Sequence, residues 1–217
     1  MSNCTRWWWV RHAPVLTEKG VIYGASDVDC DVSETAHFEA LAGALPEDAV
    51  WVTSHLTRAT KTAQAIFEAG LNFPDPVIEE HLAEQDFGDW QGLSWTAMSE
   101  TDPKSYETFW DDPTRNRPPG GESFADVIAR TAAVIKRLNA EHQGRDIVAV
   151  VHGGTIRAAL SVALGLNPVQ GMSIRVDTLS VSITEYLCEG LLQGRGGEWR
   201  VVGVNRLPEG LTERAGS

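Results

Sequence analysis

Cationic and imidazole side chains follow three short apolar runs of this sequence, at the point where each run ends. The runs are residues 7–10, 49–53 and 146–151, and the residues that follow them are Arg11, His12, His55, Arg58 and His152. Apolar runs of this length, rich in Trp and Val, are typical of buried strands. Because the carboxyl ends of strands in open α/β sheets border one crevice, we expect these side chains to meet at a common rim.

These residue types suit the binding and transfer of a phosphoryl group. Arg58 falls in the first turn of a predicted helix, where the helix dipole disfavours a cation unless an anion lies nearby. Two guanidinium groups can hold a phosphate dianion, and Gly153 after His152 lets the backbone approach it closely. A neutral imidazole can attack phosphorus, and nearby arginines favour the neutral form. We therefore predict His12 as the nucleophile, with Arg11 and Arg58 as phosphate ligands.

A phosphate ester also needs a proton for its leaving oxygen, and Glu84 is the predicted donor. A bound phosphate dianion would raise the pKa of this carboxyl group by like-charge repulsion. Asp86 and Glu122 are the next candidates for the same role. Two roles stay open for His55, which could contact the phosphate or support its loop by a hydrogen bond.

Helical patterns separate the apolar runs and define the fold class. The predicted helices span residues 33–45, 56–69, 123–142 and 155–164, with Ser33 and Ser123 as N-caps. Strands that alternate with helices predict an α/β domain with a mostly parallel sheet. Two later runs, 179–186 and 199–205, predict further strands that form a hairpin. We expect one domain over residues 1–217, with a lid-like insertion at about 88–121 over the active site.

Composition and charge limit the partners. The chain of 217 residues carries a net charge of −12, which disfavours nucleic-acid and anionic-membrane binding. Three cysteines are too few and too scattered for a disulfide framework, and the chain contains no apolar stretch of membrane-spanning length. We therefore expect a cytoplasmic protein with a small-molecule partner. The oligomeric state stays open, with a homodimer as one option.

Five motifs in a fixed order resemble those of the histidine phosphatase superfamily, in its phosphoglycerate-mutase-like branch. They are RHA at 11–13, SHLTRA at 54–59, LAE at 82–84 with FGDWQG at 87–92, GGES at 120–123, and VHGG at 151–154. The resemblance covers residues 6–164 and implies a three-layer α/β/α fold. It also implies that His12 becomes phosphorylated, that Arg11, Arg58 and His152 line the phosphate pocket, and that Glu84 is the proton donor. The resemblance implies that no metal or other cofactor is needed.

The subfamily signal comes from the first loop. RHAP followed by VIYGASD at 21–27 is similar to α-ribazole phosphatases, which implies that Tyr23 and Gly24 border the substrate. Mutases of this branch commonly carry RHGE where this chain has RHAP, and the Asn usual further downstream is not evident. The chain is also shorter than typical mutases of the branch. These departures favour hydrolysis of a small phosphorylated metabolite, with α-ribazole 5′-phosphate as a candidate.

Three alternatives compete with this interpretation. A mutase would return the phosphoryl group to the substrate, and a non-catalytic relative would keep only the fold. The third is a metalloenzyme built on His12, His55, His81 and His152, but the HExxH and HxH spacings are missing. Arg157, on the helix after His152, is interpreted as a structural ion pair rather than a ligand.

Overall fold

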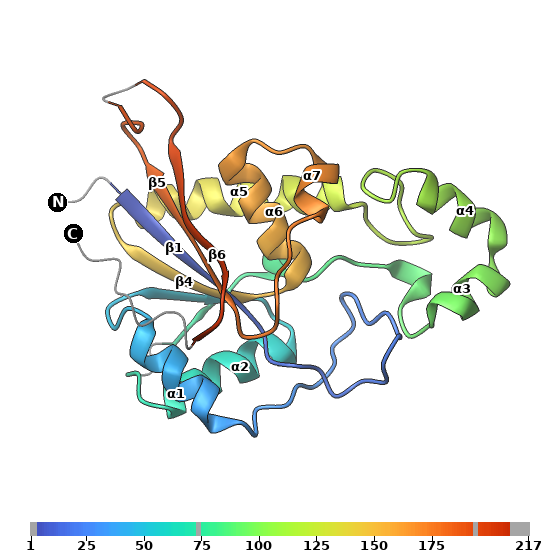
Figure 1. Ribbon diagram of the computed structural model, residues 1–217, viewed down its shortest axis with the longest axis horizontal. Helices are drawn as coiled ribbons and strands as arrows, with labels where there is room; N and C mark the ends of the chain where they lie inside the picture. Colours follow the sequence, from blue (N-terminus) through green and yellow to red (C-terminus); the bar gives the residue numbers. More distant parts are fainter. Residues whose placement is uncertain (1–3, 73–74, 193–194, 209–217) are drawn as a thin grey trace.

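A computed structural model describes residues 4–72, 75–192 and 195–208 of the chain, which fold around a six-stranded sheet (Figure 1). The strands are β1 (Cys4–Arg11), β2 (Val50–Thr53), β3 (Val77–Ile78), β4 (Asp146–Val151), β5 (Val181–Leu187) and β6 (Trp199–Arg206), in the spatial order β3-β2-β4-β1-β5-β6. Strands β1 to β4 run parallel, whereas β5 and β6 are antiparallel. The predicted α/β fold, with its mostly parallel sheet and terminal hairpin, is confirmed.

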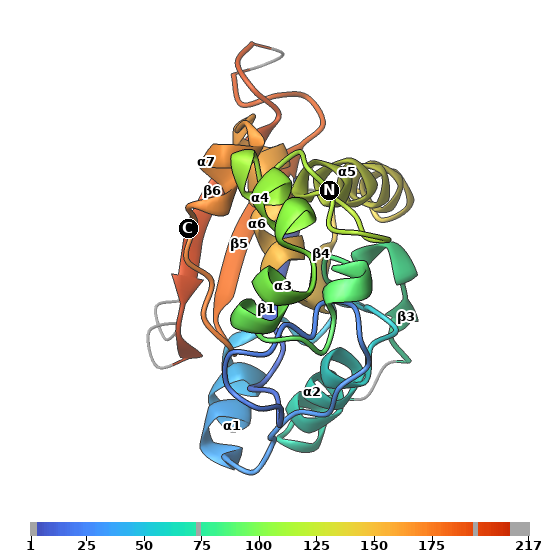
Figure 2. The ribbon, with the colours of Figure 1, turned by 90° about the vertical axis from the view of Figure 1, so that its right-hand side faces the viewer.

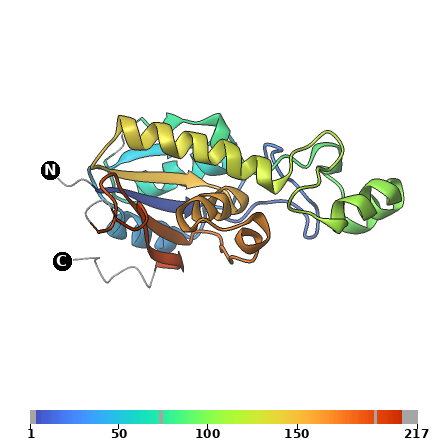
Figure 3. The same ribbon diagram turned by 90° about the horizontal axis from the view of Figure 1, so that it is seen from above.

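Helices cover both faces of the sheet and make three layers. They are α1 (Thr35–Ala44), α2 (Thr57–Glu68), α3 (Trp95–Thr101), α4 (Pro103–Asp111), α5 (Phe124–Glu141), α6 (Gly153–Leu164) and α7 (Pro168–Met172). In Figure 1, α1 and α2 lie below the sheet and α5, α6 and α7 lie above it. Figure 3 shows α5 lying along the strands of the sheet. No helix in the described part of the chain is long and apolar enough to cross a membrane.

Alternation along the central strand β1 explains why the sheet is buried on both faces. Trp7 and Trp9 pack with α5 and α6 in one core cluster, whereas Trp8 and Val10 pack with α1 and α2 in the other. The rings of Trp7 and Trp9 are stacked with centroids 4.4 Å apart. The Trp7 indole N–H donates to Asn139 Oδ1 (2.8 Å), which satisfies a buried polar group.

The helix caps agree with the sequence at one end and differ at another. Ser123 and Asp126 form a capping box at the start of α5, as predicted for Ser123. The prediction for Ser33 is wrong, because α1 begins at Thr35 after Glu34. The Ser33 N–H donates to the Asp31 carboxylate (2.9 Å), so this local turn holds Ser33 outside the helix.

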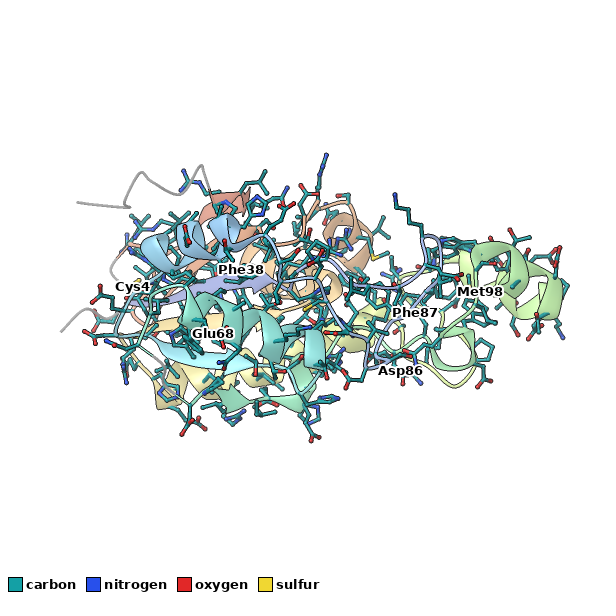
Figure 4. All side chains as sticks on the ribbon, turned by 90° about the horizontal axis from the view of Figure 1, so that it is seen from below. Cys4, Phe38, Glu68, Asp86, Phe87 and Met98 are labelled. Carbon is teal, nitrogen blue, oxygen red and sulfur yellow. The ribbon has the colours of Figure 1, made fainter. Side chains whose placement is uncertain are left out.

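Residues 88–121 form the excursion that the sequence predicts as an insertion. It contains the short 3₁₀ helix η2 (Gly88–Trp90), α3 and α4, which project at the right of Figure 1 and face the viewer in Figure 2. Figure 4 places its Met98 far from Phe38 in the body, with Asp86 and Phe87 between them. A small apolar cluster holds this excursion together. It is formed by Trp90, Met98 and Phe109 with Ile22, which lies in the first loop, between β1 and α1.

Candidate active site

The carboxyl ends of β1, β2 and β4 bring the predicted side chains together. Arg11 pairs with Val151 in the parallel register, and the His12 N–H donates to the Val151 carbonyl (2.9 Å). The rings of His12 and His152, which follow these two strands, lie with centroids 5.1 Å apart. Both imidazoles are fully buried. The sheet therefore sets the distance between the two histidines.

The hydrogen bond at His12 determines which ring nitrogen is free. His12 Nδ1 lies 2.7 Å from the carbonyl oxygen of Ala13. A carbonyl only accepts, so Nδ1 carries the hydrogen and Nε2 keeps its lone pair. No residue in the described part of the chain hydrogen-bonds to Nε2. Burial lowers the pKa of His12 to about 3, against the Ala13 hydrogen bond and with help from Arg58 and Arg11. His12 is therefore a neutral imidazole with an available Nε2.

His152 and Arg58 orient each other. Arg58 Nε donates to His152 Nδ1 (3.2 Å), so the other nitrogen, Nε2, carries the hydrogen and donates to Ser54 Oγ (2.7 Å). Burial lowers the pKa of His152 well below its usual range, and the nearby His12 imidazole and Arg58 guanidinium add to the effect. The structure thus holds His152 neutral with both nitrogens engaged. Its direct contact with a phosphate stays a prediction.

The first loop holds the Arg58 guanidinium in place. Arg58 Nη1 donates to the Ser26 carbonyl (2.7 Å) and Nη2 to the Gly24 carbonyl (2.6 Å). The Tyr23 ring lies under the guanidinium carbon at 5.0 Å from its centroid. Burial lowers the pKa of Arg58, although Glu84 and Tyr23 oppose that shift. Tyr23 and Gly24 therefore border the site by holding Arg58.

Arg11 lies against the N-terminus of α6. Arg11 Nη1 donates to the Val176 carbonyl (2.6 Å), and its Nε is buried without an acceptor among the described residues. A Cβ atom at Gly153 would lie 3.4 Å from that Nε. The absence of a side chain at this position lets the guanidinium approach the N-terminus of α6.

Glu84 lies at the N-terminus of α6. Its Oε1 accepts from the backbone N–H groups of Gly154 and Gln85, both at 3.0 Å. A Cβ atom at Gly154 would collide with this carboxylate oxygen. The sequence predicts that Gly153 lets the backbone approach a bound anion. At the next residue, Gly154, the backbone N–H donates to the carboxyl group of Glu84.

His55 is exposed on the loop after β2, and no hydrogen bond joins its side chain to another described residue. The loop is instead held by Thr57, whose N–H and hydroxyl both donate to the Asp27 carboxylate (2.6 and 2.7 Å). Of the two roles left open for His55, hydrogen-bonded support of the loop is therefore not seen. Its contact with phosphate stays a prediction.

The remaining candidate side chains are engaged elsewhere. Asp86 accepts from the Gly88 N–H (2.8 Å), and Glu122 forms an ion pair with Arg130 (2.8 Å). The prediction of an ion pair for Arg157 is wrong, because no carboxylate among the described residues pairs with it. Arg157 Nε donates to the Ile174 carbonyl (2.7 Å) instead, because the backbone after α7 passes beside it. No group of three or more His, Cys, Asp or Glu side chains in the described segments could hold a metal ion.

Ser54 and Arg130 lie in the site although the sequence does not predict them there. Ser54 accepts the His152 N–H, and its place directly after β2 could have indicated this. Arg130 lies within α5, eight residues after Glu122, and nothing in the local pattern distinguishes it from a surface arginine.

This arrangement, with a neutral histidine near two arginines at the rim of a three-layer α/β fold, defines a class of phosphoryl-transfer protein. The chain belongs to the histidine phosphatase superfamily (branch 1), whose family model matches residues 7–200. The solved α-ribazole phosphatase of Shigella flexneri shares the fold, with a TM-score of 0.77 at 21% identity. It covers 92% of this chain and 96% of its own.

Several curated relatives carry different functions. A bifunctional protein of Mycobacterium tuberculosis is 34% identical over 64% of this chain, and the match spans only 37% of that protein's length. A glucosyl-3-phosphoglycerate phosphatase of Mycolicibacterium vanbaalenii is 33% identical over 64% of this chain and 65% of its own. A 2,3-bisphosphoglycerate-dependent phosphoglycerate mutase of Gloeobacter violaceus is 32% identical over 65% and 66% respectively.

Proposed function

We propose that this protein is a phosphomonoesterase that acts through a phosphohistidine at Nε2 of His12. The observation that carries the proposal is the hydrogen bond from His12 Nδ1 to the Ala13 carbonyl, which leaves Nε2 with its lone pair. The low pKa of His12 keeps the ring neutral at physiological pH. A non-catalytic role would give no reason to keep this nitrogen free beside Arg11 and Arg58.

The reaction proceeds in two steps on these residues. The Nε2 lone pair of His12 attacks phosphorus, the bond from phosphorus to the ester oxygen breaks, and the protonated carboxyl group of Glu84 supplies its proton to that oxygen. Arg11 and Arg58 neutralise the charge on the phosphoryl oxygens. Water then attacks the phosphohistidine while the Glu84 carboxylate accepts its proton. Phosphate leaves, and His12 and Glu84 return to their starting states.

A small phosphorylated metabolite is the proposed substrate. The glucosyl-3-phosphoglycerate phosphatase relative supports hydrolysis of such a compound. The VIYGASD segment at 21–27 makes α-ribazole 5′-phosphate a candidate substrate. Tyr23 and Gly24 of this segment contact Arg58. Because two guanidinium groups supply the positive charge, we propose that catalysis needs no metal. The cytoplasmic location predicted from the cysteine pattern belongs to the same proposal.

Phosphoglycerate mutase activity is the alternative, which the Gloeobacter relative favours. The two reactions share the phosphohistidine and differ in its acceptor, which is a sugar-acid hydroxyl in the mutase and water in the hydrolase. The Ala13-Pro14 pair after His12 departs from the mutase pattern and favours the hydrolase.

A panel of phosphomonoesters, assayed in EDTA without a bisphosphorylated primer, tests the proposal. We expect sustained phosphate release from at least one alkyl phosphate, and loss of this activity by at least about 10⁴-fold in His12→Ala, as for other covalent nucleophiles. Isomerisation of 3-phosphoglycerate that depends on the primer, without net phosphate release, would establish the mutase instead. Activity that returns only with added Mg²⁺ or Zn²⁺ would contradict the metal-free mechanism.

A further inference from the structure

The segment that carries Glu84, residues 79–86, has little regular structure of its own. Only the three-residue 3₁₀ helix η1 (Glu80–Leu82) lies in it, and Glu84 follows two residues later. A proton donor works only when its oxygen lies within hydrogen-bond reach of the leaving group. The backbone around Glu84 therefore needs support from other elements.

Arg130, on α5, supplies part of this support. Its Nη1 donates to the carbonyl of His81 (2.6 Å), and its Nη2 donates to the carbonyl of Glu84 itself (3.2 Å). One guanidinium group thus binds two carbonyls of the same segment, which are three residues apart in the sequence. Its planar fork fixes the spacing of those carbonyls.

Glu122 completes the arrangement on the other side of Glu84. It accepts from Arg130 at both oxygens (Nε to Oε2, 3.0 Å; Nη2 to Oε1, 2.8 Å). Its Oε1 also accepts from the Asp86 N–H (3.0 Å), and its own carbonyl accepts from Gln85 Nε2 (2.9 Å). The exposed fractions of the two paired side chains are only 17% for Arg130 and 22% for Glu122. The ion pair is therefore partly shielded from solvent and holds the backbone both before and after Glu84.

The carboxylate of Glu84 is held from a different helix. Its oxygens accept from Gly154 at the start of α6, whereas its carbonyl accepts from Arg130 on α5. These two helices pack against each other on the same face of the sheet. We propose that the Arg130–Glu122 ion pair is a positioning device that sets the reach of the Glu84 carboxyl group toward the leaving oxygen. The inference rests on the proposed function, since it assigns no role without proton donation by Glu84.

The same helix offers a matched control. Arg137 lies two turns further along α5 and forms ion pairs with Glu79 and Glu141. Glu79 begins the same segment, so Arg137 also ties that segment to α5. Its hydrogen bonds within the described part of the chain go to Glu79 and Glu141, and none goes to the backbone of residues 81–86 or to Glu122. A general loss of support for the segment would affect Arg137→Gln and Arg130→Gln alike.

The experiment compares these two variants on an alkyl phosphate and on p-nitrophenyl phosphate, whose leaving group needs no proton. We expect Arg130→Gln to lower kcat on the alkyl phosphate by about 10- to 100-fold, the effect of a small misplacement of a catalytic group. Its kcat on p-nitrophenyl phosphate should fall by less than about threefold, and Arg137→Gln should leave both rates near wild type. Arg130→Lys should recover only part of the loss, because an ammonium cannot make all four hydrogen bonds.

A double-mutant cycle with Glu84→Gln tests whether the effect passes through Glu84. Once the acid is removed, Arg130→Gln should cause no further loss on the alkyl phosphate. Independent losses in the two backgrounds, or equal losses on both substrates, would overturn the inference. Glu122→Gln provides a second variant with the same expected pattern if Arg130→Gln does not fold. Absence of phosphatase activity in the wild type would instead contradict the proposed function.

Discussion

The rim of the sheet and the excursion of residues 88–121 are built in opposite ways. At the rim, His12, Arg58 and His152 are fully buried, and most of their polar atoms have partners in the protein. In the excursion, the exposed fraction is 44% for both Trp95 and Trp110, whose rings lie with centroids 5.6 Å apart. The first region is fixed by strands that the whole core supports. The second is held by a small cluster of its own.

This difference separates two tasks. Catalytic groups must keep their geometry within fractions of an ångström, so strand ends supported by the core suit phosphoryl transfer. Recognition of the leaving group tolerates variation and is commonly carried by loops. We therefore expect changes at the rim to affect all substrates and changes in the excursion to affect some.

Replacement of the proton donor should give the largest separation between substrates. Glu84→Gln keeps an oxygen that can accept from Gly154 but cannot donate an acidic proton. Hydrolysis of an alkyl phosphate should fall by about 10²- to 10⁴-fold, whereas p-nitrophenyl phosphate should lose much less. Steady-state rates on both substrates measure this. Equal losses would mean that Glu84 only shapes the site, and that Asp86 or Glu122 must be tested as the acid.

Arg58→Lys should reduce turnover on every substrate by about 10²-fold. An ammonium cannot donate to His152, Ser26 and Gly24 while also binding phosphate. The matched control is Arg175→Lys, because Arg175 is highly exposed and Asp177 is its single ion-pair partner among the described residues. A near-wild-type rate in Arg58→Lys would show that this position supplies charge alone.

Stability should depend on pH through the buried histidine of the rim. Unfolded His12 binds a proton near pH 6.5, whereas the folded protein excludes it until about pH 3. The free energy of unfolding therefore falls as the pH drops through 6.5, and His12 alone accounts for about 2 to 3 kcal/mol between pH 7 and pH 4.5. Urea unfolding at both pH values checks this, with His12→Gln as the comparison. The free energy of unfolding should fall more between pH 7 and pH 4.5 for the wild type than for His12→Gln. An equal fall in the two proteins would mean that His12 is not buried in its neutral form.

The smallest effects should come from the exposed tryptophans. Replacing Trp95 and Trp110 together by Ala should leave kcat on p-nitrophenyl phosphate within about twofold, and change stability by about 1 kcal/mol or less. KM should change only for larger leaving groups. Trp90→Ala offers the contrast, since Trp90 is buried against Phe109 and its loss should cost about 3 to 5 kcal/mol. A uniform fall in kcat for the double variant would contradict the separation of tasks.

The sequence predicts the elements well where a single physical pattern decides them. The apolar runs at 7–10 and 146–151 predict β1 and β4, and the glycine after residue 164 predicts the end of α6. The strand ends then bring His12 next to His152 with Arg58 beside them. Their proximity follows from parallel pairing alone, whereas their chemical roles stay predictions.

Other features depend on contacts between distant residues, which no local pattern encodes. The tautomer of His152 follows from Arg58, 94 residues earlier in the chain. Arg130 contacts Glu84 across 46 residues, and a helical pattern around 130 predicts only a partly exposed position. Ser33 has the residue type of an N-cap, but its N–H donates to the Asp31 carboxylate in a local turn that precedes the helix. Tertiary hydrogen bonds and local turns decide these cases.

The most direct test of the account is the position of the phosphoryl group during turnover. The wild-type protein is mixed briefly with labelled substrate, quenched in base and digested, and the two phosphohistidine isomers are separated. Because Nδ1 of His12 donates to Ala13, we expect label on Nε2 of His12, stable in base and lost in acid. His12→Ala should carry none. Label on Nδ1, label stable to acid, or label that persists in His12→Ala would contradict it.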